Sequence, residues 1–481
     1  MIREVVFGPP GTGKTTYIKN QVAALIEGGV SPANTYLLSF SKAGAAELAG
    51  RIKDKVNIGT LHSLCYRMAG LNRGRVIDNR KLEDYAEYSG IEIKLERIKE
   101  DGSTEELTDG ERAYAIYGLA RARGEDPMAV YEQQKDPPGN PIWFKYYMRT
   151  YDKWKETYGF VDFTDMLHLG AEIIADDATD MPIDLLVVDE AQDLSEMQWR
   201  VVRALARRAT NYIIAGDDDQ AIFAWAGADP AGMPMFLKSN GDAKPVVLGQ
   251  SYRLPAEIKG AAEKLIHQIP GRVDKPFAAL EGHDGKVVIG IRVIEMIDDR
   301  DTLILYRNHS LRQNFEPELI DLGIPYVNLN GRPSPLKSAI AALIQNIETV
   351  PSLTFVDRSL AWGLDKWWSR RDQDRLDDHE IDVLEFVGRA NYDNRVIFYL
   401  RQLMKEYGTL SAVEPKVRIS TIHGSKGREA DHVILLNSTT ANSLEGWEED
   451  RENEIRVWYV GMTRARHQLT IIEDENPVDL Q

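Results

Sequence analysis

The sequence predicts an α/β protein with two parallel sheets, each flanked by helices and each interrupted by a mainly helical inserted subdomain. Three observations carry this prediction. Short runs rich in β-branched residues and leucine alternate with helix-like patterns, which is typical of parallel α/β folds. The expected strands fall into two sets along the chain. Two helix-like stretches of different character each interrupt one of these sets.

The expected strands can be read off as short apolar runs. In the first half of the chain they are Val5–Phe7, Thr35–Phe40, Asn57–Thr60, Leu185–Asp189 and Tyr212–Ala215. In the second half they are Val246–Leu248, Thr302–Tyr306, Val417–Thr421, His432–Leu436 and Gln468–Ile472. The two sets predict two similar α/β domains.

The interruptions give the domain boundaries. Residues 66–160 are helix-like, charged and aromatic, with a Pro/Gly break at Asp136–Pro141, and residues 336–412 are again helix-like. We therefore predict a first sheet domain from residues 1–65 and 161–249, interrupted by an inserted subdomain over 66–160. The second sheet domain is predicted from residues 250–335 and 413–481, interrupted by a smaller insertion over 336–412.

The composition is that of an ordinary globular protein, with 43% hydrophobic and 28% charged residues over 481 positions. No apolar run of about eighteen residues occurs, so we expect no membrane span. The first residues, MIREVVF, lead directly into a glycine-rich loop and leave no room for a signal or transit peptide. Cys65 has no second cysteine to pair with, and we expect an inert buried thiol. These observations predict a cytoplasmic protein, in the host cytoplasm if a phage encodes it.

The net charge is −17, from 58 basic and 75 acidic residues. Proteins that coat duplex DNA without sequence preference are basic, so this balance counts against such a role. It is compatible with a narrow basic groove lined by aromatic residues on an acidic body. Composition alone leaves the partner open.

A phosphate-binding loop follows the first expected strand. Gly8–Thr15 reads GPPGTGKT, and a helix-like segment comes directly after it. Glycines let backbone N–H groups turn toward phosphate oxygens, and the helix N-terminus adds its dipole. Lys14 would then reach the β- and γ-phosphates, and the Thr15 hydroxyl would ligate Mg²⁺. The predicted nucleotide-binding residues are Gly8, Pro9, Pro10, Gly11, Thr12, Gly13, Lys14, Thr15 and Thr16.

An acidic pair ends a later strand. Asp189 and Glu190 follow four apolar residues in LLVVDEAQD, where Asp189 would hold Mg²⁺ and Glu190 would act as general base toward water. Acidic residues that only stabilise a helix N-terminus are the alternative. Far more residues separate Lys14 from Asp189 than a minimal nucleotide-binding sheet needs, which independently supports the first insertion. ATP and Mg²⁺ are the expected ligands.

At this point the chain resembles the UvrD/Rep/PcrA group of superfamily 1 DNA helicases, with motifs in family order along nearly its whole length. Segments similar to the family motifs are Leu38–Ile52 (Ia), Gly59–Leu64 (Ib), Val161–Leu167, Asp189–Asp193 (II), Ala215–Asp229 (III), Gln250–Arg253 (IV), Thr302–Tyr326, Ser420–Leu435 (V) and Tyr459–Leu469 (VI). The resemblance implies two RecA-like P-loop NTPase domains that hold one ATP between them.

The resemblance also implies roles at matching positions. Gln220 would sense the γ-phosphate, and Arg253 and Arg464 would act as arginine fingers on the phosphoryl transition state. Tyr252 would stack on adenine and Glu429 would accept a hydrogen bond from the ribose. A surface ion pair for each arginine, a core aromatic for Tyr252 and a solvated acid for Glu429 are the alternatives.

The positions matching the family's single-strand DNA contacts are Phe40, Thr60, His62, Phe223, Trp225, His423 and Lys426. Aromatic side chains stack on bases without regard to sequence, at ~1–3 kcal/mol per base. Trp225 stands among small residues, which leaves its face open to a base. Core packing of Phe40 and structural hydrogen bonds for His62 and His423 remain open. Lys366–Arg371 (KWWSRR), near Trp362, reads equally as a duplex-binding patch or as the core of a small helical subdomain.

Two features depart from the family pattern. The phosphate loop begins at residue 8, so an N-terminal segment with an adenine-reading glutamine is not expected, and ATP preference over other purine triphosphates should be weak. The second insertion is short, as would suit a compact helicase of a phage or mobile element.

The resemblance predicts an ATP-dependent DNA helicase that moves 3′ to 5′ on single-stranded DNA, binds single/double-strand junctions and acts as a monomer. A DNA-stimulated ATPase or translocase without real unwinding, in a defence, recombination or protein-displacement complex, is the alternative. A regulatory ATP-binding module without turnover is disfavoured, because the full catalytic set is present.

Overall fold

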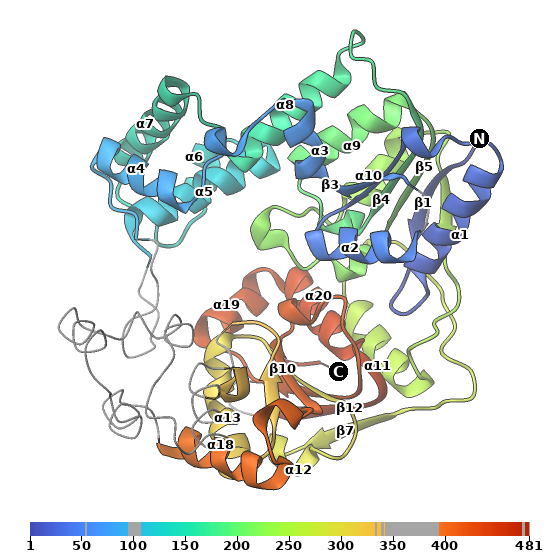
Figure 1. Ribbon diagram of the computed structural model, residues 1–481, viewed down its shortest axis with the longest axis vertical. Helices are drawn as coiled ribbons and strands as arrows, with labels where there is room; N and C mark the ends of the chain where they lie inside the picture. The colour runs from blue at the N-terminus through green and yellow to red at the C-terminus, as the bar shows by residue number, and fades with distance from the viewer. Residues whose placement is uncertain are drawn as a thin grey trace. The chain divides into compact units, whose positions relative to one another are not determined.

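The computed structural model describes residues 1–52, 55–94, 107–331, 334–337, 341, 394–473 and 477–480 (Figure 1). The chain forms two compact units. Unit 1 comprises Met1–Tyr252 and Gly271–Ala278, and unit 2 comprises Arg253–Pro270 and Ala279–Gln481. The chain therefore leaves unit 1 after Tyr252, returns for a short segment and leaves again, which the sequence did not indicate.

Unit 1 contains a six-stranded parallel sheet in the order β3-β2-β4-β5-β1-β6. Its strands are β1 (Arg3–Phe7), β2 (Thr35–Ser39), β3 (Asn57–Thr60), β4 (Ile183–Asp189), β5 (Ala209–Gly216) and β6 (Lys244–Val247). All five strands expected in the first half of the chain are confirmed. The strand expected near residue 246 also joins this sheet, where it pairs with β1.

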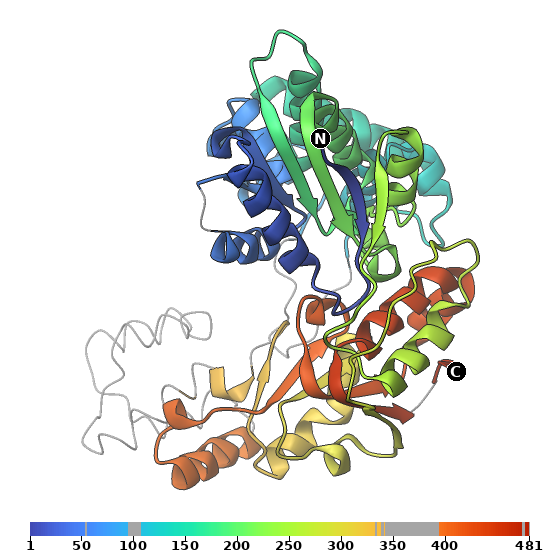
Figure 2. The same cartoon turned by 90° about the vertical axis from the view of Figure 1, so that its right-hand side faces the viewer.

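Side chains alternate between the two faces of this sheet, as the period of a strand requires. Val5 of β1 belongs to the apolar cluster on one face, whereas its neighbour Val6 belongs to the cluster on the other. Both faces are covered, because parallel strands are joined by crossover helices. Figure 2 shows the blue helices α1 (Lys14–Glu27) and α2 (Lys42–Arg51) on one side.

The other face of the first sheet is covered by helices from four places in the sequence. They are α3 (Leu61–Met68), α8 (Phe163–Ala175), α9 (Glu196–Arg208) and α10 (Gly232–Ser239). Trp199 of α9 is fully buried here, and Gly232 of α10 lies against its ring, where a Cβ atom would stand 2.0 Å from the indole nitrogen. Cys65 is buried on this face too, beside Gly170.

The first insertion forms a group of helices with a core of its own (Figure 1). They are α4 (Asn79–Ser89), α5 (Asp109–Arg123), α6 (Pro127–Glu132) and α7 (Pro141–Tyr158). Tyr147, Tyr151 and Trp154 of α7 are buried and pack against Tyr85 of α4. Aromatic spacing of three and four residues on α7 puts these rings on one helix face. An aromatic core therefore explains the composition of this stretch.

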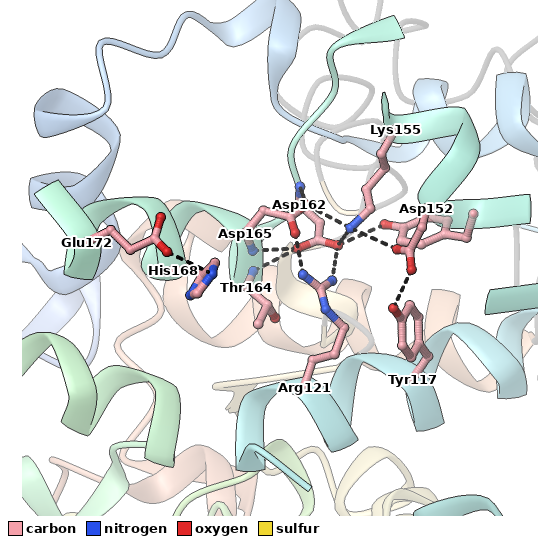
Figure 3. Close-up of polar contacts among 10 residues, drawn as sticks. Tyr117, Arg121, Asp152, Lys155, Asp162, Thr164, Asp165, His168 and Glu172 are labelled. Carbon is pink, nitrogen blue, oxygen red and sulfur yellow. Dashed lines mark hydrogen bonds and ion pairs between the residues drawn. The ribbon is translucent and has the colours of Figure 1, made fainter. Parts of the chain in front are cut away.

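A buried charge network joins this insertion to the sheet domain (Figure 3). Asp162 caps the N-terminus of α8 and accepts from the backbone N–H groups of Thr164 and Asp165 at 2.9 and 2.8 Å. Lys155 of α7 donates to Asp162 at 2.9 Å and to Asp165 at 2.8 Å, and Arg121 of α5 pairs with the same two carboxylates. One helix cap thus ties two helices of the insertion to α8.

Unit 2 contains a second six-stranded parallel sheet, in the order β7-β12-β11-β8-β10-β9. Its strands are β7 (Lys286–Gly290), β8 (Thr302–Tyr306), β9 (Tyr326–Asn328), β10 (Val417–Thr421), β11 (Ala430–Asn437) and β12 (Ala465–Glu473). The helices among its described residues are α11 (Ala256–Ile266), α12 (Val293–Met296), α13 (Glu316–Asp321), α18 (Asn394–Tyr407), α19 (Ala441–Glu449) and α20 (Arg451–Met462). Both sheets are parallel and helix-flanked, so the predicted fold class is confirmed.

Two edge strands of the second sheet, β7 and β9, were not predicted. Each is short and only half-buried over most of its length, so neither has the continuous apolar run of a central strand. Helix α18 lies within the stretch predicted as the second insertion, yet Tyr399, Leu400 and Leu403 pack into the core of unit 2. The patch Lys366–Arg371 and Trp362 lie outside the described residues. Within the described part of the chain, no helix is long and apolar enough to cross a membrane.

We expect Asp162→Asn to destabilise unit 1 by ~3 kcal/mol, because it removes one carboxylate from a buried network of opposite charges. Urea unfolding followed by circular dichroism measures the change. Asp152→Asn is the matched control: Asp152 is 51% exposed and lies 3.5 Å from Lys155, and the amide oxygen of asparagine can still accept from the Tyr117 hydroxyl, so the loss should be less than ~1 kcal/mol. Equal losses in both variants would contradict the special role of Asp162.

The same network predicts a pH dependence with a defined sign. Burial alone raises the pKa of Asp162, but Lys155 and Arg121 outweigh it and lower the pKa from 3.8 to about 2. The folded state therefore holds this proton less tightly than the unfolded state. Its stabilising contribution is complete above about pH 4 and is lost as the pH falls toward 2. The Asp162→Asn variant should lack this part of the acid transition.

Candidate functional site

The phosphate loop is a tight turn between β1 and α1. β1 pairs with β5 as far as Phe7 and Gly216, and the Gly8 N–H then donates to the Gly216 carbonyl at 2.9 Å. Gly11 and Gly13 adopt φ of 73° and 79°, a region that favours glycine. The helix begins at Lys14 directly after Gly13, so its free backbone N–H groups point into the loop. This geometry suits a bound phosphate.

The loop is held closed by its own side chains. The Lys14 ammonium donates to the Gly8 carbonyl at 3.0 Å, and the Thr12 hydroxyl donates to the Pro9 carbonyl at 2.7 Å. A Cβ atom on Gly8 would stand 2.1 Å from Cγ of Lys14. Glycine at position 8 is therefore required for the lysine to lie across the loop.

The segment after β6 is tied to the same loop. The Ser251 hydroxyl donates to the Pro10 carbonyl at 2.8 Å, and the Tyr252 N–H donates to the Gly11 carbonyl at 2.8 Å. The Tyr252 ring is 71% exposed and lies beside Gly13. The predicted adenine-stacking residue thus stands next to the phosphate loop with a ring face available.

The acidic pair lies at the end of β4, which pairs directly with β5. Asp189 is buried, and burial together with the Glu190 charge raises its pKa. Two adjacent carboxylates, one of them buried, favour an added cation. Asp189 and the Thr15 hydroxyl offer the oxygen ligands that Mg²⁺ prefers. Among the described residues, no cluster of three or more His, Cys, Asp or Glu side chains has the arrangement of a metal site.

Glu190 has a strained backbone. Its φ is 55°, and it is the one non-glycine residue with positive φ in the described ranges. Such a conformation costs ~1–3 kcal/mol and occurs often at active sites. The Glu190 N–H donates to the Asp189 carboxylate at 2.9 Å, which helps to hold the turn.

Gln192 links Glu190, after β4, to Asp217, after β5. The sequence patterns did not predict this role. The Gln192 amide nitrogen donates to the Glu190 carboxylate, and its amide oxygen accepts from the Asp217 N–H at 3.0 Å. A Cβ atom on Gly216 would stand 2.3 Å from this oxygen, so glycine there permits the contact. Asp217 in turn accepts from the Gln220 side chain at 2.7 Å. A continuous hydrogen-bond chain therefore runs from Glu190 to Gln220.

Three predicted DNA-contact residues of unit 1, all aromatic, lie next to one another. Phe40, which follows β2, stacks on Phe223 with ring centroids 5.4 Å apart, and Phe223 meets Trp225 at 6.2 Å. Trp225 is 68% exposed, whereas Phe40 also packs against the core of the sheet domain. Arg123, from the end of α5, donates to the Ala224 carbonyl at 2.9 Å and so supports the short turn that carries Trp225.

Thr60 and His62 lie at the start of α3. The Thr60 hydroxyl caps this helix by accepting from the Ser63 N–H at 3.2 Å. The His62 ring meets the edge of Phe163, and burial lowers the pKa of His62 to about 4. A neutral imidazole at physiological pH offers a hydrogen bond or a ring face to a nucleic acid, and no charge.

The remaining predicted residues lie in unit 2. Arg253 forms an ion pair with Glu429, and Glu429 also pairs with Arg466. Burial alone raises the pKa of Glu429, and the two arginines outweigh it and lower that pKa. Arg464 is buried and donates to the Val460 carbonyl at 2.9 Å, at the end of α20. His423 and Lys426 are half-buried in and just after the turn that follows β10.

Comparison with known proteins bears on this arrangement. Residues 3–240 match the family described as the UvrD/REP helicase N-terminal domain, and residues 390–476 match the UvrD-like helicase C-terminal domain. The chain belongs to the UvrD-like helicase family. The two matches cover strands of both sheets, so the two units of this UvrD-like chain are the two RecA-like domains of the family.

Individual relatives are distant. The chain is 24% identical to the ATP-dependent DNA helicase UvrD2 of Mycobacterium tuberculosis, over 97% of this chain and 76% of that protein. It is 24% identical to DNA helicase II of Escherichia coli (strain K12), over 67% of this chain and 48% of that protein. With the ATP-dependent DNA helicase PcrA of Leuconostoc citreum, the values are 24%, 68% and 48%. The matched region spans about half the length of the last two proteins.

We expect Gly8→Ala to weaken nucleotide binding by about 10–100-fold, because the new Cβ displaces Lys14 and a charge-assisted contact is lost. Titration with a fluorescent ATP analogue measures the change. Gly50→Ala in α2 is the control, since a Cβ there meets nothing within 4 Å. Wild-type affinity in the Gly8 variant would show that the lysine position does not matter.

Proposed function

We propose that this chain is an ATP-dependent DNA helicase that moves 3′ to 5′ on single-stranded DNA. The observation that carries the proposal is the hydrogen-bond chain from Glu190 through Gln192 and Asp217 to Gln220. It starts at the proposed general base and ends five positions before the exposed Trp225. The short segment from Gln220 to Trp225 therefore connects the proposed site of ATP hydrolysis to the proposed base-stacking residue.

Nucleotide binding begins at the phosphate loop. The N–H groups at the start of α1 donate to the phosphates, and Lys14 exchanges the Gly8 carbonyl for phosphate oxygens. Tyr252 stacks on the base beside the loop. Thr15 and Asp189 would hold Mg²⁺, which would supply positive charge to the phosphates.

Hydrolysis requires an oriented water molecule. Glu190 accepts the proton of that water, while the hydrogen bond from Gln192 fixes the rotation of the Glu190 carboxylate. Gln220, held by Asp217, lies at the end of the same chain of contacts and reports the state of the γ-phosphate. The positive φ of Glu190 sets the direction of its Cα–Cβ bond.

The proposal assigns the developing negative charge to two arginines of unit 2. Arg253 and Arg464 act as arginine fingers, which contribute about 10³–10⁵ in rate in other phosphoryl-transfer sites. Arg253 would then exchange its pairing with Glu429 for the phosphates, and Glu429 would keep its pairing with Arg466. The relatives named ATP-dependent DNA helicase support the proposed use of ATP.

Movement along DNA follows from stacking. Trp225 presents an exposed ring, and Phe40 and Phe223 continue the aromatic surface behind it. Thr60, His62, His423 and Lys426 complete the proposed track. Each ATP cycle would advance the strand by about one base, since the stacked rings accept any base.

A single set of measurements tests the proposal. ATP turnover is measured with and without oligo-dT, together with strand displacement from 3′-tailed and 5′-tailed duplexes. Displacement from a 3′ tail alone supports a 3′–5′ helicase, and stimulated turnover without displacement supports a translocase that does not unwind. If oligo-dT leaves turnover unchanged, the DNA-motor proposal fails.

We expect Glu190→Gln to keep nucleotide affinity and to lower kcat by about 10²–10⁴-fold, because the amide accepts no proton from water. Steady-state ATP turnover and nucleotide titration measure the two effects. Glu196→Gln, in the first turn of α9, removes a carboxylate away from this site and should leave both unchanged. Retained turnover in the Glu190 variant would assign the base elsewhere.

We expect Trp225→Ala to leave ATP turnover without DNA near wild type and to raise the oligo-dT concentration for half stimulation roughly tenfold or more, through lost stacking. Tyr146→Ala is the control, since Tyr146 is also exposed, at 52%, but lies on α7. An equal effect of the two variants would speak against a specific role of Trp225.

A further inference from the structure

The short segment Gly271–Ala278 follows α11 in the sequence but belongs to unit 1. Its end is fixed by backbone hydrogen bonds: the Ala278 N–H donates to the Gly249 carbonyl at 2.8 Å, and the Ser251 N–H donates to the Ala278 carbonyl at 2.9 Å. The segment is thereby attached to the residues that also hold the phosphate loop.

Lys275 of this segment is buried among carboxylates. Its ammonium lies 3.1 Å from Asp217, 2.6 Å from Asp218 and 2.9 Å from Asp219. The Lys275 side chain is 1% exposed, and those of the three aspartates are 0%, 5% and 2% exposed. Arg272 adds a second cation at 2.6 Å from Asp219. Few lysines are buried this completely, and they require such partners.

The charges of this cluster depend on one another. Burial alone lowers the pKa of Lys275, but the three aspartates outweigh it and raise that pKa. Burial alone raises the pKa of Asp217, but the charges of Lys275 and Lys14 and the hydrogen bond from Gln220 together outweigh it and lower that pKa. Lys275 therefore remains charged and helps to keep the Asp217 carboxylate ionised.

The two oxygens of Asp217 serve different partners. Oδ1 faces Lys275 and also accepts from the Asp219 N–H at 3.3 Å, and Oδ2 accepts from the Gln220 side-chain nitrogen at 2.7 Å. The ion pair fixes the rotation of the carboxylate, so the Gln220 amide is held in one orientation. The Asp217 N–H is meanwhile held by Gln192, which contacts Glu190.

We propose that Lys275 is a positioning residue for ATP hydrolysis: it orients Gln220, and through Asp217 and Gln192 also Glu190, without touching the nucleotide. The inference rests on the proposed function, since it presumes that Gln220 and Glu190 act on ATP. It adds a residue outside the helicase motifs recognised in the sequence, and links the site to a segment that returns from unit 2.

The test compares Lys275→Met with Lys264→Met, an exposed lysine of α11 that serves as the control. We measure kcat per folded molecule, nucleotide affinity and hydrogen exchange of the peptide containing Asp219 and Gln220. We expect Lys275→Met to lower kcat at least about tenfold, with nucleotide affinity within about threefold of wild type, as for an interaction realised in the transition state. The Asp219 and Gln220 amides, which donate to Asp217, should exchange faster.

Because Lys275→Met leaves buried carboxylates short of a cation, Lys275→Met/Asp218→Asn removes one negative charge and supports folding. We expect this double variant to regain thermal stability while kcat stays low, since Asp217 still lacks its ion pair. If the role of Lys275 were purely structural, the double variant would regain both thermal stability and kcat, and that result would overturn the proposal.

Unchanged kcat per folded Lys275→Met molecule, with wild-type turnover present, would also overturn the positioning role and leave the proposed function intact. Absence of ATP turnover in the wild-type chain would instead sink the proposed function, and the positioning role with it. The two failures are therefore distinguishable in the same assay.

Discussion

The pairing of β5 with its two neighbours is the constraint on which the rest of the site depends. β5 lies between β4 and β1, and all three run parallel, so their carboxyl ends meet at one edge. The phosphate loop after β1, Asp189 at the end of β4 and Asp217 after β5 all lie at that edge. A slip of one residue in any of these pairs would turn alternate side chains to the opposite face and separate the groups.

Buried charge in unit 1 is handled in two ways. Asp162 and the Asp217–Asp219 run are matched by Lys155, Arg121, Lys275 and Arg272, so these networks hold structure in place. Asp189 is buried beside Glu190, and its pKa is raised, so this site favours an incoming cation. The contrast separates neutralised charge networks from a buried acidic pair whose pKa is raised.

Sequence patterns predicted most strands of the two sheets, because central parallel strands are buried on both faces and therefore form continuous apolar runs. The half-exposed edge strands β7 and β9 lacked that signal, and α18 was assigned to an insertion because helix periodicity does not reveal which core a helix joins. In the site, Gly8–Thr15 and Asp189 were predictable from spacing. Gln192 lay within the recognised DEAQD segment, yet its link to Asp217 depends on β5, which is distant in sequence.

By itself, the sequence determined the α/β class, the phosphate loop, the acidic strand end and the resemblance to UvrD-like helicases, because these rest on local residue types and spacing. The tertiary structure alone decided that Lys275 returns to pair with Asp217, that Arg123 supports the Trp225 turn, and that Glu190 and Gln220 share one hydrogen-bond chain. Burial and opposite charge select these partners across long stretches of chain, and no local pattern encodes them.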